Sequence, residues 1–484
     1  MNYEEVLRLG LERGFFMPSC EIYSDAPGGF WDYGPLGVNL RNRFIELWRR
    51  ELVRKDGMIE IDGAQIMPKS VFIASGHLES FADPIISCKN CNTILRADKF
   101  ITEKIGKYIP ERLSNEEFDK LIQSYGLRCP NCNGEFSKTK RFNMMFKVGI
   151  GPAEDEAYLR PETCQTIFTN FPRLFKIMRG KLPLGFAQFG KSFRNEISPR
   201  QSLIRLREFY QAEIEVFFNP KKANEFEKFN LIKDYSLRIF KDGKIEKVTC
   251  QEALDKQLTP NKLITYYLAL IQKFYDKTGI DMERSRFRTL AEDERAFYAQ
   301  VAYDFEVETS LGWIELVACN YRTDYDMSGH GKVSGKDVRV MDNGEKIIPH
   351  IFELSMGVDR SIYCILEHNL KRDGERLLLS LKPYLAPIQV SIFPLVNRDS
   401  LPEKARSIYL MLRDDFDVFY DESGSIGRRY RRMDEIGTPI NITIDYQTLK
   451  DDTITIRDRD SMKQFRVSIA NLKETLRQII YKYD

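Results

Sequence analysis

Charged side chains gather between residues 193 and 218 in a pattern that suits binding of phosphates and an amine. The stretch begins Phe-Arg-Asn-Glu, passes through a loop containing proline, and returns as a segment whose residues alternate. In a strand, alternation puts successive residues on opposite faces. One face then carries Tyr210, Ala212, Ile214, Val216 and Phe218, and the other carries Arg207, Phe209, Gln211, Glu213 and Glu215.

A strand with one side in water is the simplest interpretation of this alternation. Two antiparallel strands joined by the loop would instead bring Arg194, Arg207 and several carboxylates onto one surface. Such a surface could hold a substrate that has both phosphate groups and an amino group.

Two further charged residues stand in unusual places. Glu315 lies in the middle of an apolar strand, where an unpaired buried charge would cost several kcal/mol. It must therefore lie at an edge, be paired, or hold a cation, which in an ATP-using enzyme would be Mg²⁺. Arg360 lies in the first turn of an expected helix, which is unfavourable for a cation unless an anion is near.

Four cysteines form two Cys-x-x-Cys pairs, Cys88 with Cys91 and Cys129 with Cys132. Thiolates two residues apart can reach one tetrahedral Zn²⁺ from a tight turn, although the gap between the pairs exceeds the usual ~15–20 residues. Four thiolates leave no position for a catalytic water, so a structural zinc is expected. The other five cysteines are scattered singly, and no disulfide framework is predicted.

The segments 193–196 and 205–209, with the loop between them, resemble motif 2 of the class II aminoacyl-tRNA synthetases in the version typical of glycyl-tRNA synthetases. Residues 142–171 also resemble that family, through Phe-Asn-Met-Met-Phe and Arg-Pro-Glu-Thr-Cys-Gln, as does the glycine-rich Asp-Tyr-Gly-Pro-Leu-Gly that ends at Gly37. The chain departs from the family pattern at Cys164, Thr166 and Ser202.

The elements that must position these residues resemble the other two class II motifs. Residues 35–68 begin with an apolar helical stripe and resemble motif 1, which forms the dimer interface in the family. Periodicity alone fits an internal core helix equally well. Residues 347–368 read as a strand followed by a helix and closely resemble motif 3.

The resemblance implies roles for individual residues. The catalytic set is Arg194, Glu196 and Arg360. The ATP-binding set is Arg194, Asn195, Glu196, Ile204, Arg205, Leu206, Arg207, Glu208, Phe209, Glu315, Leu316, Gly357, Val358, Asp359 and Arg360, with Glu315 as the Mg²⁺ ligand. The glycine-binding set is Arg96, Glu162, Phe209, Gln211, Glu213, Glu353 and Ser355.

The fold class expected is α+β. An antiparallel-sheet class II catalytic domain should span residues 1–380, with motif 2 at about 186–218 and two insertions. The first insertion, at about 84–140, carries the zinc knuckles, and the second, at about 219–285, is expected to be helical with a lysine-rich exterior.

After residue 380 strands and helices alternate, which predicts an α/β domain with a partly parallel sheet. It resembles the anticodon-binding domain that several class II synthetases share. The densest positive cluster in the chain lies here, and it is predicted either to contact tRNA or to be a solvated helix face: Arg428, Arg429, Tyr430, Arg431 and Arg432.

Composition sets broader limits. The 484 residues carry a formal charge of +2, which neither indicates nor excludes a nucleic-acid partner. No apolar run is long enough to span a bilayer, and the N-terminus does not look like a secretory signal or a transit peptide. A cytoplasmic protein without a membrane partner is therefore expected.

The function implied is ATP-dependent ligation of glycine to tRNA(Gly) through glycyl-adenylate, by a homodimer that uses Mg²⁺ and carries a structural Zn²⁺. One alternative is a class II synthetase for another small amino acid. The other is a catalytically inactive synthetase-like module that binds tRNA or assists a DNA polymerase.

Overall fold

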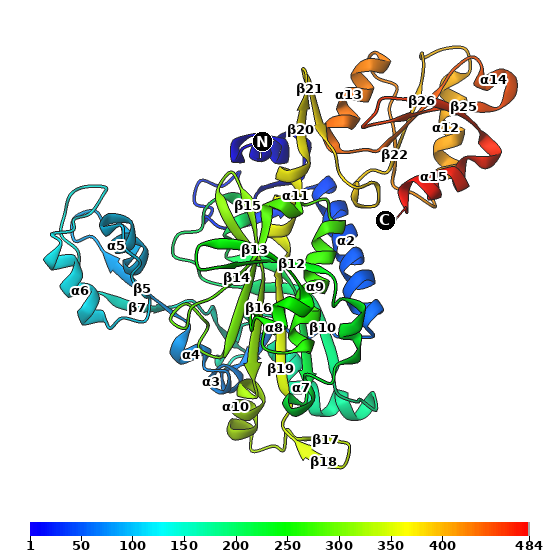
Figure 1. The fold of residues 1–484 in the computed structure, drawn as a ribbon. Helices are drawn as coiled ribbons and strands as arrows, with labels where there is room; N and C mark the ends of the chain where they lie inside the picture. The colour runs from blue at the N-terminus through cyan, green and yellow to red at the C-terminus, as the bar shows by residue number, and fades with distance from the viewer. Residues whose placement is uncertain (483–484) are drawn as a thin grey trace.

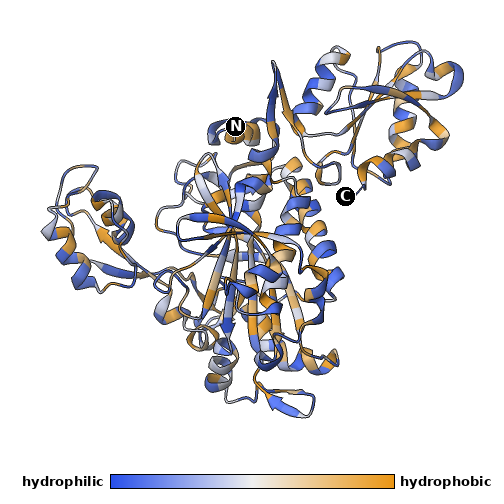
Figure 2. Cartoon of the chain, viewed as in Figure 1, coloured by the Kyte–Doolittle hydropathy of each residue, from blue (hydrophilic) through white to orange (hydrophobic). Residues whose placement is uncertain are grey.

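The computed structural model describes residues 1–482. A central body built on a nine-stranded sheet carries a small insertion on one side, drawn in cyan, and a C-terminal domain at one end, drawn in orange and red (Figure 1). Figure 2 shows hydrophobic residues concentrated on the central strands and on the helices packed against them. No helix among the described residues is long and apolar enough to cross a bilayer.

The central sheet is mainly antiparallel, as expected for the fold class. Only its β12–β14 and β10–β3 pairs are parallel. From edge to edge its strands are β13 (Lys244–Thr249), β12 (Ser236–Lys241), β14 (Ser285–Thr289), β15 (Val301–Thr309), β16 (Gly312–Thr323), β19 (His350–Gly357), β11 (Glu208–Phe218), β10 (Leu184–Phe193) and β3 (Ile59–Glu60).

The expected motif 2 hairpin is present, because β10 and β11 pair antiparallel along their full length, from Leu184 opposite Phe217 to Phe193 opposite Glu208. Both faces of β11 are buried. Glu213 and Glu215 have no exposed surface, so the charged face does not meet water. The simplest interpretation of the alternation is therefore wrong here, because β11 lies between β10 and β19 with helices over both faces.

The apolar stripe of the expected motif 1 helix packs inside the chain. Helix α2 (Pro35–Trp48) continues as a π-helical segment (Arg49–Arg54), and Leu40, Phe44 and Trp48 lie in the main core. Phe44 packs edge-on against Phe274 of α9 (Lys262–Lys277). The stripe thus forms the internal core helix that periodicity allowed, and it does not leave an apolar face for a second subunit.

The prediction of helices over 219–285 is correct for α8 (Cys250–Asp255) and α9 and wrong for 236–249. The latter residues form the β12–β13 hairpin, which extends the central sheet. Leu237 and Ile239 are fully buried and alternate with the half-buried Ser236, Arg238 and Phe240, a period-2 pattern hidden by the high lysine content. This segment is therefore part of the central body.

The first insertion has its own small core of Ile86, Ala97, Phe100, Ile101 and Phe118. A three-stranded sheet and two helices build it (Figure 1), namely β5 (Ala82–Ser87), β6 (Ile94–Arg96), β7 (Lys140–Asn143), α5 (Ala97–Ile105) and α6 (Asn115–Ser124).

The C-terminal domain matches the expected alternation closely. Strands β23, β22 and β24 are parallel, and β25 and β26 add antiparallel, so the sheet is partly parallel. The elements are β22 (Val390–Pro394), α12 (Leu401–Leu412), β23 (Val418–Tyr420), α13 (Ile426–Ile436), β24 (Ile440–Ile444), α14 (Thr448–Asp451), β25 (Thr453–Asp458), β26 (Gln464–Ser468) and α15 (Leu472–Ile480).

The remaining elements surround the central sheet. Helix α11 (Val358–Asn369) follows β19 directly and packs into the main core. The others are α1 (Tyr3–Arg13), β1 (Phe16–Pro18), β2 (Trp31–Tyr33), β4 (Ile66–Pro68), α3 (Lys69–Ala74), α4 (His77–Ser80), β8 (Lys147–Ile150), β9 (Asp155–Leu159), α7 (Gln165–Ile177), α10 (Tyr325–Ser334), β17 (Val340–Asp342), β18 (Glu345–Ile347), β20 (Leu370–Asp373) and β21 (Arg376–Leu379).

Candidate functional site

A cavity of about 430 Å³ opens over the central sheet at β11, β15, β16 and β19. It brings together most of the residues that the sequence singled out. Those on its wall are Glu162, Arg194, Glu196, Ile204, Arg205, Leu206, Phe209, Gln211, Glu315, Glu353, Ser355, Gly357, Asp359 and Arg360.

Arg194 stands where β10 ends. Its Nε donates to the Pro161 carbonyl oxygen at 3.0 Å, and its guanidinium lies over the rings of Phe81 and Phe209, 5.4 Å from each centre. Its backbone N–H donates to the carbonyl oxygen of Arg207 at 2.8 Å. One side of the guanidinium is thus anchored, and within the described chain its two terminal nitrogens have no protein partner. They are free to bind an anion in the cavity.

The loop between the strands of motif 2 is held by its own charges. Arg205 forms an ion pair with Glu196 at 2.6 Å, and Arg207 donates to the backbone carbonyls of Glu196 and Gly28. Ser202 adopts a φ of +46°, a conformation that glycine reaches without strain. This conformation explains why glycine is common at this position in the family that the sequence resembles. Here serine adopts the same turn.

Arg360 and Glu315 meet on the opposite wall. Arg360 Nη1 lies 3.5 Å from Glu315 Oε2 and donates to the Glu315 carbonyl oxygen at 3.1 Å. The Glu315 side chain is 42% exposed and paired with Arg360, so it is not a buried unpaired charge, although β16 lies inside the central sheet and not at its edge. Asp304 of the neighbouring strand shares the wall, and burial together with Glu315 raises its pKa to about 8. Two acids side by side favour a cation between them.

Deeper in the cavity lies a buried cluster organised by Arg322. Its guanidinium donates to Glu353 at 2.7 Å and to both carboxylate oxygens of Asp326 at 2.7 and 2.8 Å. It also stacks on the Tyr298 ring at 3.7 Å. Asn320 donates to the other oxygen of Glu353 at 2.6 Å. Burial, opposed by Arg322, raises the pKa of Glu353 to about 8.

Glu162 completes the cluster from the loop before α7. Gln165 donates to its carboxylate at 2.7 Å, and the His77 and Arg322 nitrogens lie 3.5 and 3.6 Å away. Although burial opposes ionisation, His77 and Arg322 hold the pKa of Glu162 well below its usual range. Carboxylate oxygens of Glu162 and Glu353 lie within 4.8 Å of each other, a spacing suited to gripping one ammonium group.

Glu213 sits just beneath the cavity wall. Ser355 and Thr163 donate to its two oxygens at 2.6 and 2.5 Å, so Glu213 orients Ser355. Gln211 donates to the Ser355 hydroxyl at 3.2 Å. The side-chain amide oxygen of Gln211, Oε1, is buried and accepts no hydrogen bond within residues 1–482, which leaves an acceptor beside the acids.

Glu215 lies one step further into the sheet, directly opposite Glu353 on the next strand. It is fully buried, and neither of its oxygens has a hydrogen-bond partner in the described chain. Burial and the charge of Glu353 raise its pKa well above the usual range. We expect it to be neutral, which limits the negative charge stored behind the cavity.

Several predicted site residues do not reach the cavity wall. Arg96 is engaged within the insertion, with ion pairs to Asp83, Asp98 and Glu111 at 2.8–3.2 Å, and does not line the cavity. Leu316 and Val358 are core residues, Glu208 pairs with Lys191, and the backbone N–H of Asn195 donates to Met144. These residues support the site and do not line it.

The sequence analysis missed Asp304, Asn320, Arg322 and Tyr298 as site residues. For Asn320 and Arg322 the alternation was misleading, because both stand an odd number of positions from Glu315, and a register shift opposite Phe305 and Glu306 brings Asn320 onto the same cavity wall as Glu315. Arg322 was the harder case, since no spacing shows that an arginine will be fully buried among acids from three other segments.

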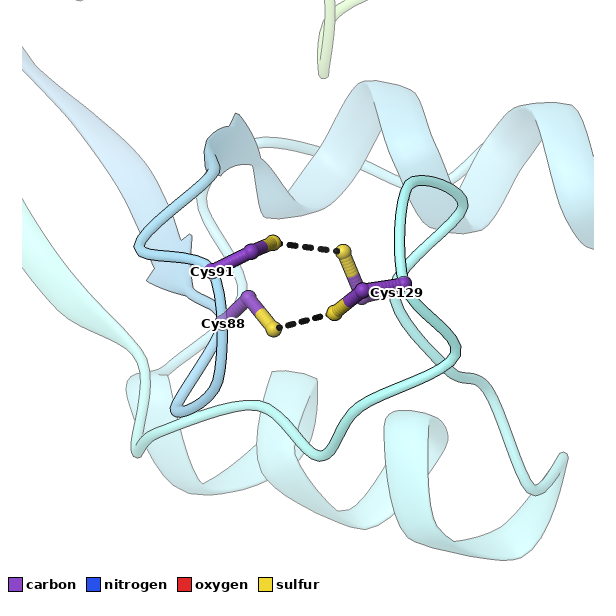
Figure 3. A group of neighbouring side chains, drawn as sticks. Cys88, Cys91 and Cys129 are labelled. Carbon is purple, nitrogen blue, oxygen red and sulfur yellow. Dashed lines mark hydrogen bonds between the residues drawn. The ribbon is translucent and has the colours of Figure 1, made fainter.

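The four knuckle cysteines converge at the tip of the insertion (Figure 3). Their sulfurs all lie within 4.8 Å of one another, with Cys88–Cys132 at 3.4 Å and Cys91–Cys129 at 3.6 Å. A tetrahedral Zn²⁺ with ~2.3 Å bonds separates its sulfurs by roughly 3.8 Å. The cluster is therefore consistent with a zinc site.

The two knuckles share one backbone shape. In each, the residue after the second cysteine is an asparagine with positive φ, 56° at Asn92 and 58° at Asn133. Its N–H donates to the carbonyl oxygen of the first cysteine, Cys88 or Cys129. Asparagine tolerates this left-handed conformation better than most residues. The repeated Cys-x-x-Cys-Asn sequence thus encodes two matching turns.

The basic cluster of α13 divides into two parts. Arg429 is 2% exposed and donates to the carbonyl oxygens of Pro394, Leu395 and Asp421. Tyr430 packs against Phe393, its hydroxyl meets that of Thr443, and Arg457 lies over its ring. Both are engaged inside the domain, which does not favour the base-stacking role expected for Tyr430. Arg428 and Arg431 are exposed.

Known proteins show the same two-part organisation. The model described as "tRNA synthetase class II core domain (G, H, P, S and T)" matches residues 146–369, and that described as "Anticodon binding domain" matches residues 389–479. The glycine–tRNA ligase of Methanocaldococcus jannaschii is 38% identical, with 98% of both chains covered. That of Pyrococcus furiosus is 40% identical, with 99% of both covered, and that of Methanothrix thermoacetophila is 38% identical.

Proposed function

The chain belongs to the family of glycine–tRNA ligases, and from that premise we propose how its cavity ligates glycine to tRNA. The supporting observation is one cavity that joins a group of buried acids to two arginines with room for an anion. The acids suit the ammonium group of an amino acid, and the arginines suit the phosphates of ATP.

Glycine would lie over the deep cluster. Its ammonium group would be held by Glu162 and Glu353, with the side-chain amide oxygen of Gln211 as a further acceptor and Ser355 beside it. Its carboxylate would then point towards Arg194. Attack of this carboxylate on the α-phosphate gives glycyl-adenylate and releases pyrophosphate, and the 3′-terminal adenosine of tRNA subsequently accepts glycine.

Arg194 would bind the α-phosphate, where negative charge increases in the transition state, and Arg360 would bind the distal phosphates. Phe209 and the segment Ile204–Leu206 line the same space and suit the adenine. Glu315 and Asp304 fit Mg²⁺ by their chemistry, and that ion would supply charge neutralisation on the leaving pyrophosphate. The residues of the chain act by positioning and electrostatic stabilisation.

Family membership sets aside the inactive-module alternative and favours glycine over another small amino acid. A selective cavity must also reject alanine, which differs by one methyl group. Because the deep cluster is fully buried and closely bonded, that methyl would have to displace packed atoms. We expect alanine-dependent pyrophosphate exchange to be at least about 100-fold slower than glycine-dependent exchange, as a matched comparison of kcat/KM would measure.

Comparable exchange with alanine or serine would contradict this placement of glycine. If the Glu353→Gln variant catalyses glycine-dependent exchange at the parent rate, the ammonium group of glycine binds elsewhere. The two results distinguish an error of specificity from an error of placement.

We further propose that the insertion binds one structural Zn²⁺ through Cys88, Cys91, Cys129 and Cys132. The metal would hold two knuckles that the small insertion core cannot hold alone. Elemental analysis should find about one Zn²⁺ per chain, and Cys91→Ser combined with Cys132→Ser should lose it. Cys20→Ser, at an exposed cysteine outside the cluster, serves as the matched control.

Metal-free protein with all four cluster thiols freely titratable in the native state would refute the zinc assignment. The four cysteines lie outside the cavity, but Lys99, Tyr108 and Glu111 of the same insertion line it, so pyrophosphate exchange by the cysteine variant also reports whether the metal helps to position that wall.

We also propose a homodimer that acts in the cytoplasm, where charged tRNA is consumed. The small sheet that follows the motif 1 helix exposes Ile66 and Ile150, each at 48%, and α3 exposes Ile73 at 52%. A second subunit could cover them. Sedimentation equilibrium should give twice the chain mass of 56.6 kDa, and a mass of one chain at micromolar concentration would exclude this arrangement.

A further inference from the structure

A basic groove lies on the seam between the central body and the C-terminal domain. It has a volume of about 400 Å³ and is lined by Arg13, Ser423, Gly424, Arg428, Arg431, Arg432 and Glu435. Arg13 is the last residue of α1, whereas the others belong to α13 and the loop before it. Four arginines against one glutamate make this seam groove strongly positive.

Two of these arginines have side chains without a partner among residues 1–482. The side chains of Arg428 and Arg431 are exposed and form no hydrogen bond or ion pair with any described residue. They stand three positions apart on α13 and therefore share one helix face. Arg432 is different, because it pairs with Asp421 at 2.8 Å and donates to Ser423 at 2.6 Å.

Arg13 brings the central body into the same groove. It pairs with Glu435 at 2.5 Å across the seam, 422 positions away in the chain. Helix α1 in turn packs on α11, the helix that carries Arg360, through Tyr3 and Tyr363 at 6.0 Å. The seam groove is thus attached to both domains.

We propose that the seam groove binds backbone phosphates of tRNA, with Arg13, Arg428 and Arg431 as the contacting side chains. The proposal rests on the tRNA ligase function given above and adds a surface shared by both domains. Arginine suits phosphate because its planar guanidinium can donate two parallel hydrogen bonds. Arg428 and Arg431 gain most from such a contact, since no protein ion pair must be broken first, and Arg13 adds its charge beside them while it is paired with Glu435.

The variant that combines Arg13→Gln, Arg428→Gln and Arg431→Gln should bind transcribed tRNA(Gly) about tenfold or more weakly. The slope of log Kd against log salt concentration should become shallower by about two, because fewer counterions are released. Arg413→Gln, at an exposed arginine outside the groove, is the matched control and should keep the parent's affinity and slope.

Two single variants separate phosphate binding from a purely structural ion pair. Arg13→Gln and Glu435→Gln both break the seam pair, but only the first removes positive charge from the groove. Arg13→Gln should weaken tRNA binding, whereas Glu435→Gln should leave it unchanged or tighten it. Equal weakening by both would show that the pair merely holds the domains together, and would overturn the proposal.

Pyrophosphate exchange, measured without tRNA, separates this inference from the proposed function. Loss of exchange in the parent protein would contradict the catalytic assignment and not the groove. Parent-like tRNA affinity and salt slope in the triple variant, with exchange intact, would overturn the groove and leave the catalytic assignment standing.

Discussion

Replacing Arg194 with alanine should lower glycine-dependent pyrophosphate exchange by about 100-fold or more. The guanidinium is anchored through Pro161 and two aromatic rings, so its free nitrogens point at a fixed place in the cavity. A preorganised charge at the position where charge develops contributes more to the transition state than to the ground state. The loss should therefore appear mainly in kcat, measured by exchange over a range of ATP concentrations.

Arg200→Ala provides the matched control, because Arg200 is an exposed arginine in the same loop that does not line the cavity. It should exchange at close to the parent rate. Arg194→Lys should recover little, since lysine cannot reproduce two parallel hydrogen bonds or stack between rings. An Arg194→Ala variant with parent-like exchange and an unchanged thermal transition would remove Arg194 from the chemistry.

Replacing Arg322 with methionine should destabilise the central body by about 3–5 kcal/mol and abolish glycine activation. The arginine is fully buried and is the cation that Glu353 and Asp326 share, with Glu162 close by. Removing it leaves carboxylates buried without a counter-charge, a much larger cost than that of a surface pair. Chemical denaturation, followed by fluorescence of the central body, measures the loss of stability.

The comparison variant is Arg54→Met, which breaks a pair with Glu46 whose two side chains are 60% and 55% exposed. It should cost at most about 1 kcal/mol. Arg322→Lys tests position separately from charge. It should recover part of the stability while keeping a raised KM for glycine, because one ammonium group cannot hold Glu353 and both oxygens of Asp326 together. Parent-like stability in Arg322→Met would show that the acids are neutral in the folded protein.

Local sequence predicted the parts of the site that lie on one element or one hairpin. The alternation after Arg207 gave the β10–β11 pair, and the strand-then-helix pattern placed Arg360 in the first turn of α11. The two Cys-x-x-Cys pairs gave the thiol cluster. In each case the geometry follows from spacing within a few residues, which the 2.0 and 3.6 periods describe directly.

Local patterns failed where the answer depended on a neighbour distant in sequence. From periodicity alone, the apolar stripe of α2 could face either a second subunit or the core. It faces the core because it packs against α9, which is distant in sequence. The charged composition of residues 236–249 predicted a helix. These residues instead form a hairpin, because β12 pairs with β14 at the edge of the central sheet. The sequence grouped Arg429 and Tyr430 with their exposed neighbours. In the structure both side chains bond to groups inside the domain, Arg429 to Pro394 and Tyr430 to Thr443.

The sequence by itself indicated which groups we propose this protein uses: two arginines for phosphates, acids for an ammonium group, and four thiols for a metal. Only the tertiary structure decided which acids stay charged. Glu162 and Glu215 are both buried, yet the first lies beside His77 and Arg322, whereas the second lies beside the acids Glu213 and Glu353 and neither of its oxygens accepts a hydrogen bond in the described chain. A buried carboxyl group stays ionised only where other segments of the same chain bring an opposite charge beside it. Its protonation state is therefore fixed by the fold and cannot be derived from spacing along the chain.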